Sequence, residues 1–172
     1  MDYLISDTHF GHANIIKYCN RPFADIGEMN GKMIHNWNKT VTPEDTVYHL
    51  GDFSLGSAEW VRNYRYQLVG NIVLIMGNHD HRSVGFWGKL GILAHKRPII
   101  VDGMIFSHAP VMHPELPNIH GHTHQNNTNI EGIHICVSVE QIDYTPISID
   151  KIKERVTNAQ QVVLDGKDKD VP

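Results

Sequence analysis

The chain has 172 residues, of which 41% are hydrophobic and 20% are charged, and its formal net charge at pH 7 is −4. These values are typical of a globular protein of about one domain, with enough apolar side chains to bury a sizeable core. They give no sign of the basic stripe that follows a nucleic-acid backbone, and no apolar run approaches the roughly 20 residues of a membrane-spanning helix.

Cysteine and histidine usage narrows the choice further. Cys19 and Cys136 lie far apart and outside any CxxC pattern, so we expect them to be reduced and buried rather than joined in a disulfide. A predicted strand starts within the first three residues, which leaves no room for a signal peptide and favours a cytoplasmic location. The chain carries 13 histidines, several in short groups of the kind that form metal sites.

Strands and helices alternate in the first half of the chain. Strands are predicted at residues 1–6, 47–50 and 72–76. Asp25 and Glu28 form a capping box for a helix, and the stripe along that helix predicts core packing of Met29, Met33, Ile34 and Trp37. Ser57 caps the next helix, which we expect to end at Gly70 and to turn four side chains inward, those of Trp60, Val61, Tyr64 and Leu68.

The second half is richer in strands. Residues 82–97 are ambiguous, because two glycines argue against a long helix, whereas residues 98–101 and 104–106 form a predicted hairpin around Asp102-Gly103. A strand is expected at residues 133–139, then a helix from Ser148 or Asp150, and a last strand at 162–164. We therefore expect one domain over residues 1–164, with mixed sheets, and a charged, mobile end at residues 165–172.

The tetrapeptide Gly77-Asn78-His79-Asp80 directly follows the apolar run at residues 72–76. The edge where strands end is where binding sites form in open α/β sheets. Five predicted strand ends carry side chains of metal-ligand type, and this repetition makes a metal site a strong prediction. These polar side chains are Asp7, His9, Asp52, Asn78, His79, His108, His122 and His124.

Spacing and ligand type indicate which metals fit. In Asp7-x-His9 and His122-x-His124, extended backbone would place the two side chains on one side, with Cα atoms roughly 6.5 Å apart. This spacing suits two metals about 3.5–4 Å apart. The set has carboxylates, imidazoles and an amide but no thiolate, which excludes a structural zinc finger and disfavours Mg²⁺, whereas Mn²⁺, Fe, Zn²⁺ and Ni²⁺ fit. Two divalent ions and two carboxylates leave a net positive centre that attracts an anion and acidifies bound water.

These motifs occur in the order and spacing of the calcineurin-like metallophosphoesterases, which the chain resembles over roughly residues 3–140. It is most similar to the small, single-domain prokaryotic and phage members, and residues 7–16 resemble one compact subgroup. The resemblance implies a four-layer α/β/β/α sandwich with two mixed sheets, and two divalent ions, with Mn²⁺ as the first expectation.

The resemblance also implies a role for each position. One metal would be held by Asp7, His9, Asp52 and His124, and the other by Asp52, Asn78, His108 and His122. A hydroxide between the metals would attack phosphorus, His79 would contact the substrate and protonate the leaving oxygen, and Asp80 would orient His79. Asn78 and His12 would also contact the substrate. The alternative for His12 is that it is an exposed loop histidine without a role.

Other polar residues receive weaker interpretations. Arg21 could bind phosphate, but we expect a surface arginine before Pro22. His49 and His120 precede ligand positions on predicted strands, so we expect them to face away from the metals and to lie in the core or to support the ligands. No role is predicted for His35, His81, His95, His113 or His134.

The predicted activity is metal-dependent hydrolysis of a small phosphodiester, nucleotide-like or cyclic. A diester carries one negative charge and has a poor leaving group that an acid at His79 would help, and no cap domain is visible to enclose a small monoester. The alternatives are a phosphomonoesterase and a non-catalytic scaffold, as in the retromer subunit that resembles this family. A processive nuclease is disfavoured because no basic channel is evident. The substrate, the native metal and the oligomeric state stay open.

Overall fold

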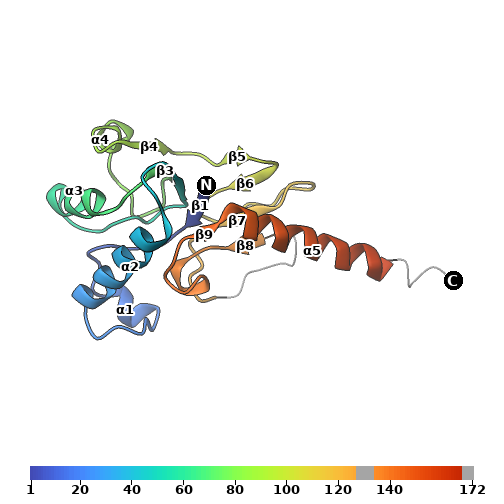
Figure 1. Cartoon of the computed structure of the whole chain (residues 1–172), viewed down its shortest axis with the longest axis horizontal. Coiled ribbons are helices and arrows are strands. Elements are labelled where there is room, and N and C mark those ends of the chain that lie inside the picture. The colour runs from blue at the N-terminus through green and yellow to red at the C-terminus, as the bar shows by residue number, and fades with distance from the viewer. Residues whose placement is uncertain (127–133, 168–172) are drawn as a thin grey trace.

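The structure is a computed structural model that describes residues 1–126 and 134–167, with side chains described up to residue 159. Two sheets form its centre (Figure 1), one of five strands in the order β4-β3-β2-β1-β9 and one of four in the order β5-β6-β7-β8. Each sheet is mixed, because β9 and β5 run antiparallel to their neighbours and the other pairs are parallel. Within the described residues, no helix is both long enough and apolar enough to cross a membrane.

The first sheet and its helices come from the first half of the chain. Successive βα units explain the parallel order, because each helix returns the chain to the start of the next strand. Asp25 and Ser57 cap α2 and α3 as predicted, accepting hydrogen bonds from the backbone N–H groups of Glu28 and Trp60. The elements are β1 (Asp2–Ile5), α1 (Ile15–Tyr18), α2 (Ile26–Thr40), β2 (Thr46–His49), α3 (Ala58–Gln67), β3 (Asn71–Ile75), α4 (Val84–Gly88) and β4 (Ile92–His95).

The second sheet begins with the predicted hairpin. Asp102 and Gly103 both have positive φ, 50° and 74°, which is the backbone of a tight hairpin turn whose twist matches the strands. The remaining elements are β5 (Ile99–Val101), β6 (Met104–Phe106), β7 (Asn118–His120), β8 (His134–Cys136), the 3₁₀ turn η1 (Val139–Gln141), β9 (Ile147–Ser148) and α5 (Ile149–Lys167).

Alternation along the central strands divides the apolar residues between two cores. On β3, Ile72 and Leu74 join the cluster with the helices, whereas Ile75 joins a second cluster between the sheets. The predicted Met/Trp stripe of α2 packs in the first cluster, and α5 contributes Ile149, Ile152 and Val156 to the second. Helices, two mixed sheets and the C-terminal helix thus form the predicted metallophosphoesterase sandwich.

Several local predictions were wrong. Residues 162–164 belong to α5 and not to a strand, and α5 continues through residues 165–167 of the predicted mobile end. Residues 168–172, and the start of the predicted strand at 133, lie outside the described residues. The side chain of Trp60 is 54% exposed rather than packed inward.

Two further observations concern residues 82–97, whose secondary structure the sequence left ambiguous, and the two cysteines. Residues 82–97 split into the short helix α4 and the edge strand β4, because Gly91 adopts a positive φ of 69° between them. Both cysteines are buried and neither is disulfide-bonded.

Candidate metal centre

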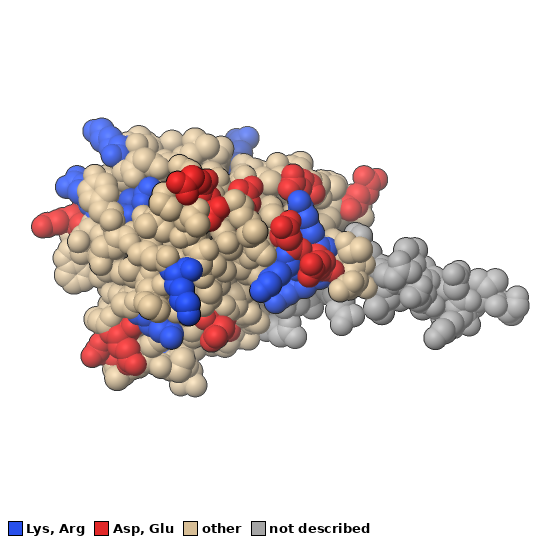
Figure 2. Space-filling model, viewed as in Figure 1, with Lys and Arg blue, Asp and Glu red and all other residues tan. Residues whose placement is uncertain are grey.

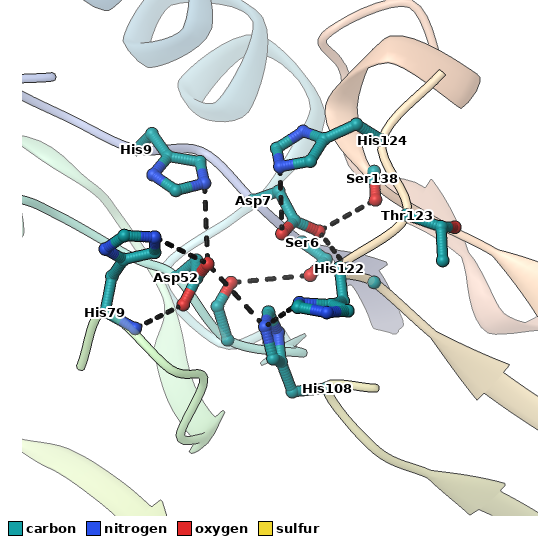
Figure 3. A network of polar contacts seen from close by, with 12 residues as sticks. Ser6, Asp7, His9, Asp52, His79, His108, His122, Thr123, His124 and Ser138 are labelled. Atoms are coloured by element: carbon teal, nitrogen blue, oxygen red, sulfur yellow. Dashed lines mark hydrogen bonds and ion pairs between the residues drawn. The ribbon is translucent and has the colours of Figure 1, made fainter. Parts of the chain in front are cut away.

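The two sheets bring the predicted ligands together at one edge. Parallel strands β1, β2 and β3 end at the same edge of the first sheet, and β6 and β7 end at the facing edge of the second. A bridge between Ser6 and Ser138 joins the sheets at this edge. The side chains that follow these strands converge on one cluster (Figure 3), comprising Asp7, His9, Asp52, Asn78, His79, His108, His122 and His124.

One half of the cluster consists of Asp7, His9 and His124, whose ligand atoms lie within 4.8 Å of one another. His124 Nε2 is 3.7 Å from Asp7 Oδ1. Asp7 Oδ1 and His9 Nε2 are buried and have no hydrogen-bond partner among the described residues. Burial, aided by the charges of His124 and Arg21, lowers the pKa of His9 well below its usual range, so its ring is neutral. Buried, unpartnered acceptors of this kind fit a divalent cation.

The other half is built around His108. Its Nδ1 donates to the carbonyl oxygen of Leu50 at 2.8 Å, which leaves the Nε2 lone pair free to bind a metal. Asn78 Oδ1 lies 2.8 Å and His122 Nδ1 3.1 Å from this Nε2. Oxygen and nitrogen acceptors that meet so closely match the coordination chemistry of Mn²⁺, Fe, Zn²⁺ and Ni²⁺.

Asp52 lies between the two halves. Its Oδ2 is 3.5 Å from His9 Nε2 on one side and 3.6 Å from His108 Nε2 on the other. The ligand atoms of Asp7, Asp52 and His108 also lie within 4.8 Å of one another. A carboxylate in this place can contact an ion in either half, which supports the bridging role that the resemblance implied for Asp52.

The backbone of the ligands differs from the extended geometry expected from their spacing. Asp7, His9, Asp52, His122 and His124 all have positive φ, between 49° and 69°. Left-handed backbone is costly for residues with a Cβ and is concentrated at functional sites. The prediction that the Asp-x-His and His-x-His pairs lie on extended strands was therefore wrong, because the strands end before these residues and tight turns aim the side chains.

His79 occupies the open side of the cluster. Its side chain is 38% exposed, and its Nε2 lies 4.0 Å from Asp52 Oδ2. Its backbone N–H donates to Asp52 Oδ1 at 2.8 Å, which fixes the loop against the Asp52 carboxylate. An imidazole that faces both the ligands and solvent is placed to meet a substrate.

Asp80 does not act as the sequence suggested. Its buried carboxylate accepts from the backbone N–H groups of Asp52, Phe53 and Gly77 at 2.7–3.1 Å, and no hydrogen bond to the His79 ring occurs among the described residues. Burial, assisted by the Asp52 charge and opposed by these N–H groups, raises the pKa of Asp80 to about 6. The carboxylate therefore ties together the loops after β2 and β3, and it positions His79 only through the backbone.

His12 lies next to the cluster, as predicted, but not within it. Its Nδ1 is 3.4 Å from His9 Nδ1, and its ring centroid is 6.1 Å from that of His79. Burial and the His79 charge lower the pKa of His12, which favours the neutral ring. Its place on the His79 side is compatible with contact to a bound phosphate.

Sequence reasoning missed a buried network behind His124. Glu140 Oε1 accepts a hydrogen bond from His124 Nδ1 at 3.0 Å, which directs Nε2 toward Asp7. Arg21 pairs with the same oxygen at 2.8 Å and donates to the backbone oxygens of Asp7 and Thr8. Arg21 is 4% exposed, so it is neither the expected surface residue nor a phosphate ligand.

Opposing effects set the charge states in this network. Burial lowers the pKa of His124, but hydrogen bonds with Cys19 and Glu140 and the Asp7 charge raise it overall, to about 10. Burial raises the pKa of Glu140, but the hydrogen bond from His124 and the Arg21 charge lower it overall. The only sequence signal for Glu140 is a charged residue directly after the predicted strand at residues 133–139.

Two histidines face away from the cluster, as expected. His49 is fully buried, with Nε2 2.9 Å from Thr8 Oγ1, and burial together with the His108 charge lowers the pKa of His49 to about 3. His120 is buried and its Nδ1 donates to the backbone oxygen of Gly121. Both pack behind the loops that carry the ligands.

Comparison with known proteins agrees with this geometry. The profile of the calcineurin-like phosphoesterase family matches residues 3–159. An uncharacterized protein of Methanocaldococcus jannaschii is 41% identical over 177 residues, covering 93% of each chain. The Gene 66 protein of Mycobacterium phage L5 is 27% identical over 143 residues, which cover 72% of this chain and 67% of the phage protein.

Two solved structures are similar in fold. A protein of unknown function from Aquifex aeolicus superposes with a TM-score of 0.71 at 30% identity, covering 90% of this chain and 98% of that one. The nuclease MPE of Pseudomonas putida gives a TM-score of 0.51 at 23% identity, covering 72% of this chain and 61% of the nuclease. The second likeness concerns the fold alone.

Proposed function

The chain belongs to the calcineurin-like phosphoesterase family, and we propose that it is a dinuclear phosphodiesterase acting on a small, nucleotide-like or cyclic phosphodiester. The observation that carries the proposal is the position of Asp52, between a group with Asp7, His9 and His124 and a group with His108. One ion would be held by the first group and Asp52, and the other by Asp52, Asn78, His108 and His122. We expect Mn²⁺, with Fe, Zn²⁺ or Ni²⁺ able to replace it.

Two bound divalent ions would supply positive charge and an acidified water molecule. The protein's own residues would orient the metal-binding side chains and donate a proton to the leaving group. Glu140 and the Leu50 carbonyl orient the rings of His124 and His108, so that their Nε2 atoms face the centre. His79, beside Asp52 and open to solvent, would give a proton to the leaving oxygen, a step in which a positioned acid typically contributes about 10²–10⁴-fold.

Charge and the open site favour a diester. A diester carries one negative charge, which a centre with two divalent ions and two carboxylates accommodates even when hydroxide is present. An alkoxide leaving group is poor and gains most from an acid such as His79. On the face shown in Figure 2, lysines and arginines are interspersed with acidic residues and form no continuous stripe.

The experiment starts from metal-stripped protein reloaded separately with Mn²⁺, Ni²⁺, Zn²⁺ and Mg²⁺. Metal content is measured, and hydrolysis of bis(p-nitrophenyl) phosphate is compared with that of p-nitrophenyl phosphate. We expect two metals per chain and faster hydrolysis of the diester with Mn²⁺ or Ni²⁺. Faster hydrolysis of the monoester would identify a phosphatase instead, and two bound metals without turnover on either substrate would favour a non-catalytic scaffold.

A further inference from the structure

A cavity of about 450 Å³ opens directly beside His79 and Asp80. It lies between the loop after β2 and helix α4, and none of the proposed metal ligands lines it. Its volume falls in the range of small-molecule sites. The wall residues that matter for the argument are Ser54, Gly56, Arg82, Ser83, Phe86 and Trp87.

The far wall of the cavity combines aromatic surface with a guanidinium group. Phe86 is partly exposed, and the Arg82 guanidinium carbon lies 5.0 Å from the centre of its ring. Arg82 Nη2 donates to the backbone oxygen of Gly56 at 2.9 Å, which holds the guanidinium across the cavity. Such a wall suits a flat, polar ring that stacks and accepts hydrogen bonds.

A second cavity, of about 530 Å³, shares four wall residues with the first, namely Asp80, His81, Arg82 and Ser83. It is also lined by Lys96, so positive charge continues away from His79. A hydroxyl-rich or phosphorylated extension of the ligand would meet favourable charge there. An alkyl or lipid leaving group would gain nothing from Arg82 and Lys96.

We propose that this cavity binds a nucleoside leaving group, an inference that rests on the proposed phosphodiesterase function. The oxygen of water would bond to phosphorus as the water loses a proton to solvent, and the bond from phosphorus to the nucleoside oxygen would break. A proton from His79, which His79 regains from solvent after the step, would complete the nucleoside hydroxyl. The leaving oxygen must lie at His79 to receive that proton, so the group attached to it extends past His79 into the cavity. Its base lies against Phe86 and Arg82.

The test uses the methyl diester of thymidine 5′-phosphate, which offers two alkoxide leaving groups in one molecule. Release of the nucleoside gives thymidine and methyl phosphate, whereas release of methanol gives thymidine 5′-phosphate. We expect the wild-type protein, loaded with Mn²⁺, to produce mainly thymidine and methyl phosphate, measured by chromatography. Because both products come from the same active enzyme, their ratio does not depend on the fraction of folded or metal-loaded protein.

Phe86→Leu and Arg82→Met are each expected to shift this ratio about tenfold toward thymidine 5′-phosphate, the size of one lost stacking contact. Tyr66→Leu, on a side chain that is 68% exposed and outside the cavity, is the matched control and should not shift it. A wild-type product of mainly thymidine 5′-phosphate, or an unchanged ratio in both cavity variants, overturns the inference. Hydrolysis of bis(p-nitrophenyl) phosphate without hydrolysis of the nucleoside diester overturns it too, whereas failure on both substrates contradicts the proposed function itself.

Discussion

Arg21→Met is expected to be among the most destabilising single substitutions in this protein. The guanidinium is buried, pairs with Glu140 at 2.8 Å, and donates to the backbone oxygens of Asp7 at 2.7 Å and Thr8 at 3.1 Å. It therefore joins the segment after β8 to the turn that carries the candidate ligands Asp7 and His9. Methionine fills similar volume but replaces none of these bonds.

The expected loss in the free energy of unfolding can be worked out from the groups that Arg21→Met leaves without a partner. Removing one partner of a buried ion pair costs about 3–5 kcal/mol, because the remaining charge is uncompensated. Glu140 keeps its hydrogen bond from His124, which reduces that cost, whereas two carbonyl oxygens lose a donor at about 1–3 kcal/mol each if they stay buried. We expect a net loss of about 4–6 kcal/mol in the free energy of unfolding, a large share of the stability of a typical domain.

Urea unfolding of metal-free protein measures this loss from the transition midpoint at constant slope. Arg62→Met, on an exposed arginine of α3, is the control and should change stability by less than about 0.5 kcal/mol. In a double-mutant cycle with Glu140→Gln, the double variant should lose about 2 kcal/mol less than the sum of the single variants. A loss below about 1 kcal/mol for Arg21→Met, or strict additivity in the cycle, would refute the assigned network.

Three further outcomes are expected. The pKa of His49 is about 3 in the folded protein, against an ordinary value of 6.5 for histidine, so the unfolded chain binds the proton first and stability falls as pH drops below 6.5. Between about pH 7.5 and about pH 5, the wild type should lose about 2 kcal/mol more than His49→Gln in urea unfolding, and equal losses would contradict the burial argument. A Cβ at Gly77 would collide with Asp52 Oδ1, so Gly77→Ala should lower turnover about 100-fold, whereas Gly88→Ala, with open space at its Cβ, should not. His79→Ala should keep its metal content by elemental analysis and lose most of its turnover, and full activity would remove His79 from the mechanism.

The sequence predicted well what depends on pattern. Short apolar runs located β1, β2 and β3, and the turn residues Asp102-Gly103 located the hairpin. It failed where packing decides between alternatives of equal local propensity. The short apolar pattern at residues 162–164 is compatible with a strand or a helix, and in the structure these residues continue helix α5. Trp60 fits a helical stripe, but α3 turns it outward beside Gly56 and Gly11.

The composition of the site could also be read from the sequence, because each candidate ligand follows an apolar strand. The residues that hold the candidate ligands in place could not be predicted, because they act through contacts between distant segments of the chain. Glu140 reaches His124 across 16 residues, and Arg21 reaches Glu140 across 119. The role of Asp80 was misjudged for the same reason. Two of its three partners are backbone N–H groups in another loop, those of Asp52 and Phe53, and no sequence motif predicts such contacts.

The left-handed ligand residues explain how two short motifs build a compact centre. On extended backbone, Asp7 and His9 would stand about 6.5 Å apart at Cα and share one ion poorly. With φ values of 57° and 50° the chain turns back, and their ligand atoms fall within 4.8 Å of each other and of His124. Each such residue costs about 1–2 kcal/mol, so the turns persist only if other contacts hold them. Ser138 and the His122 N–H bind the Asp7 carboxylate, and Arg21 binds the backbone oxygen of Asp7, which means that the buried network maintains the geometry before any metal arrives.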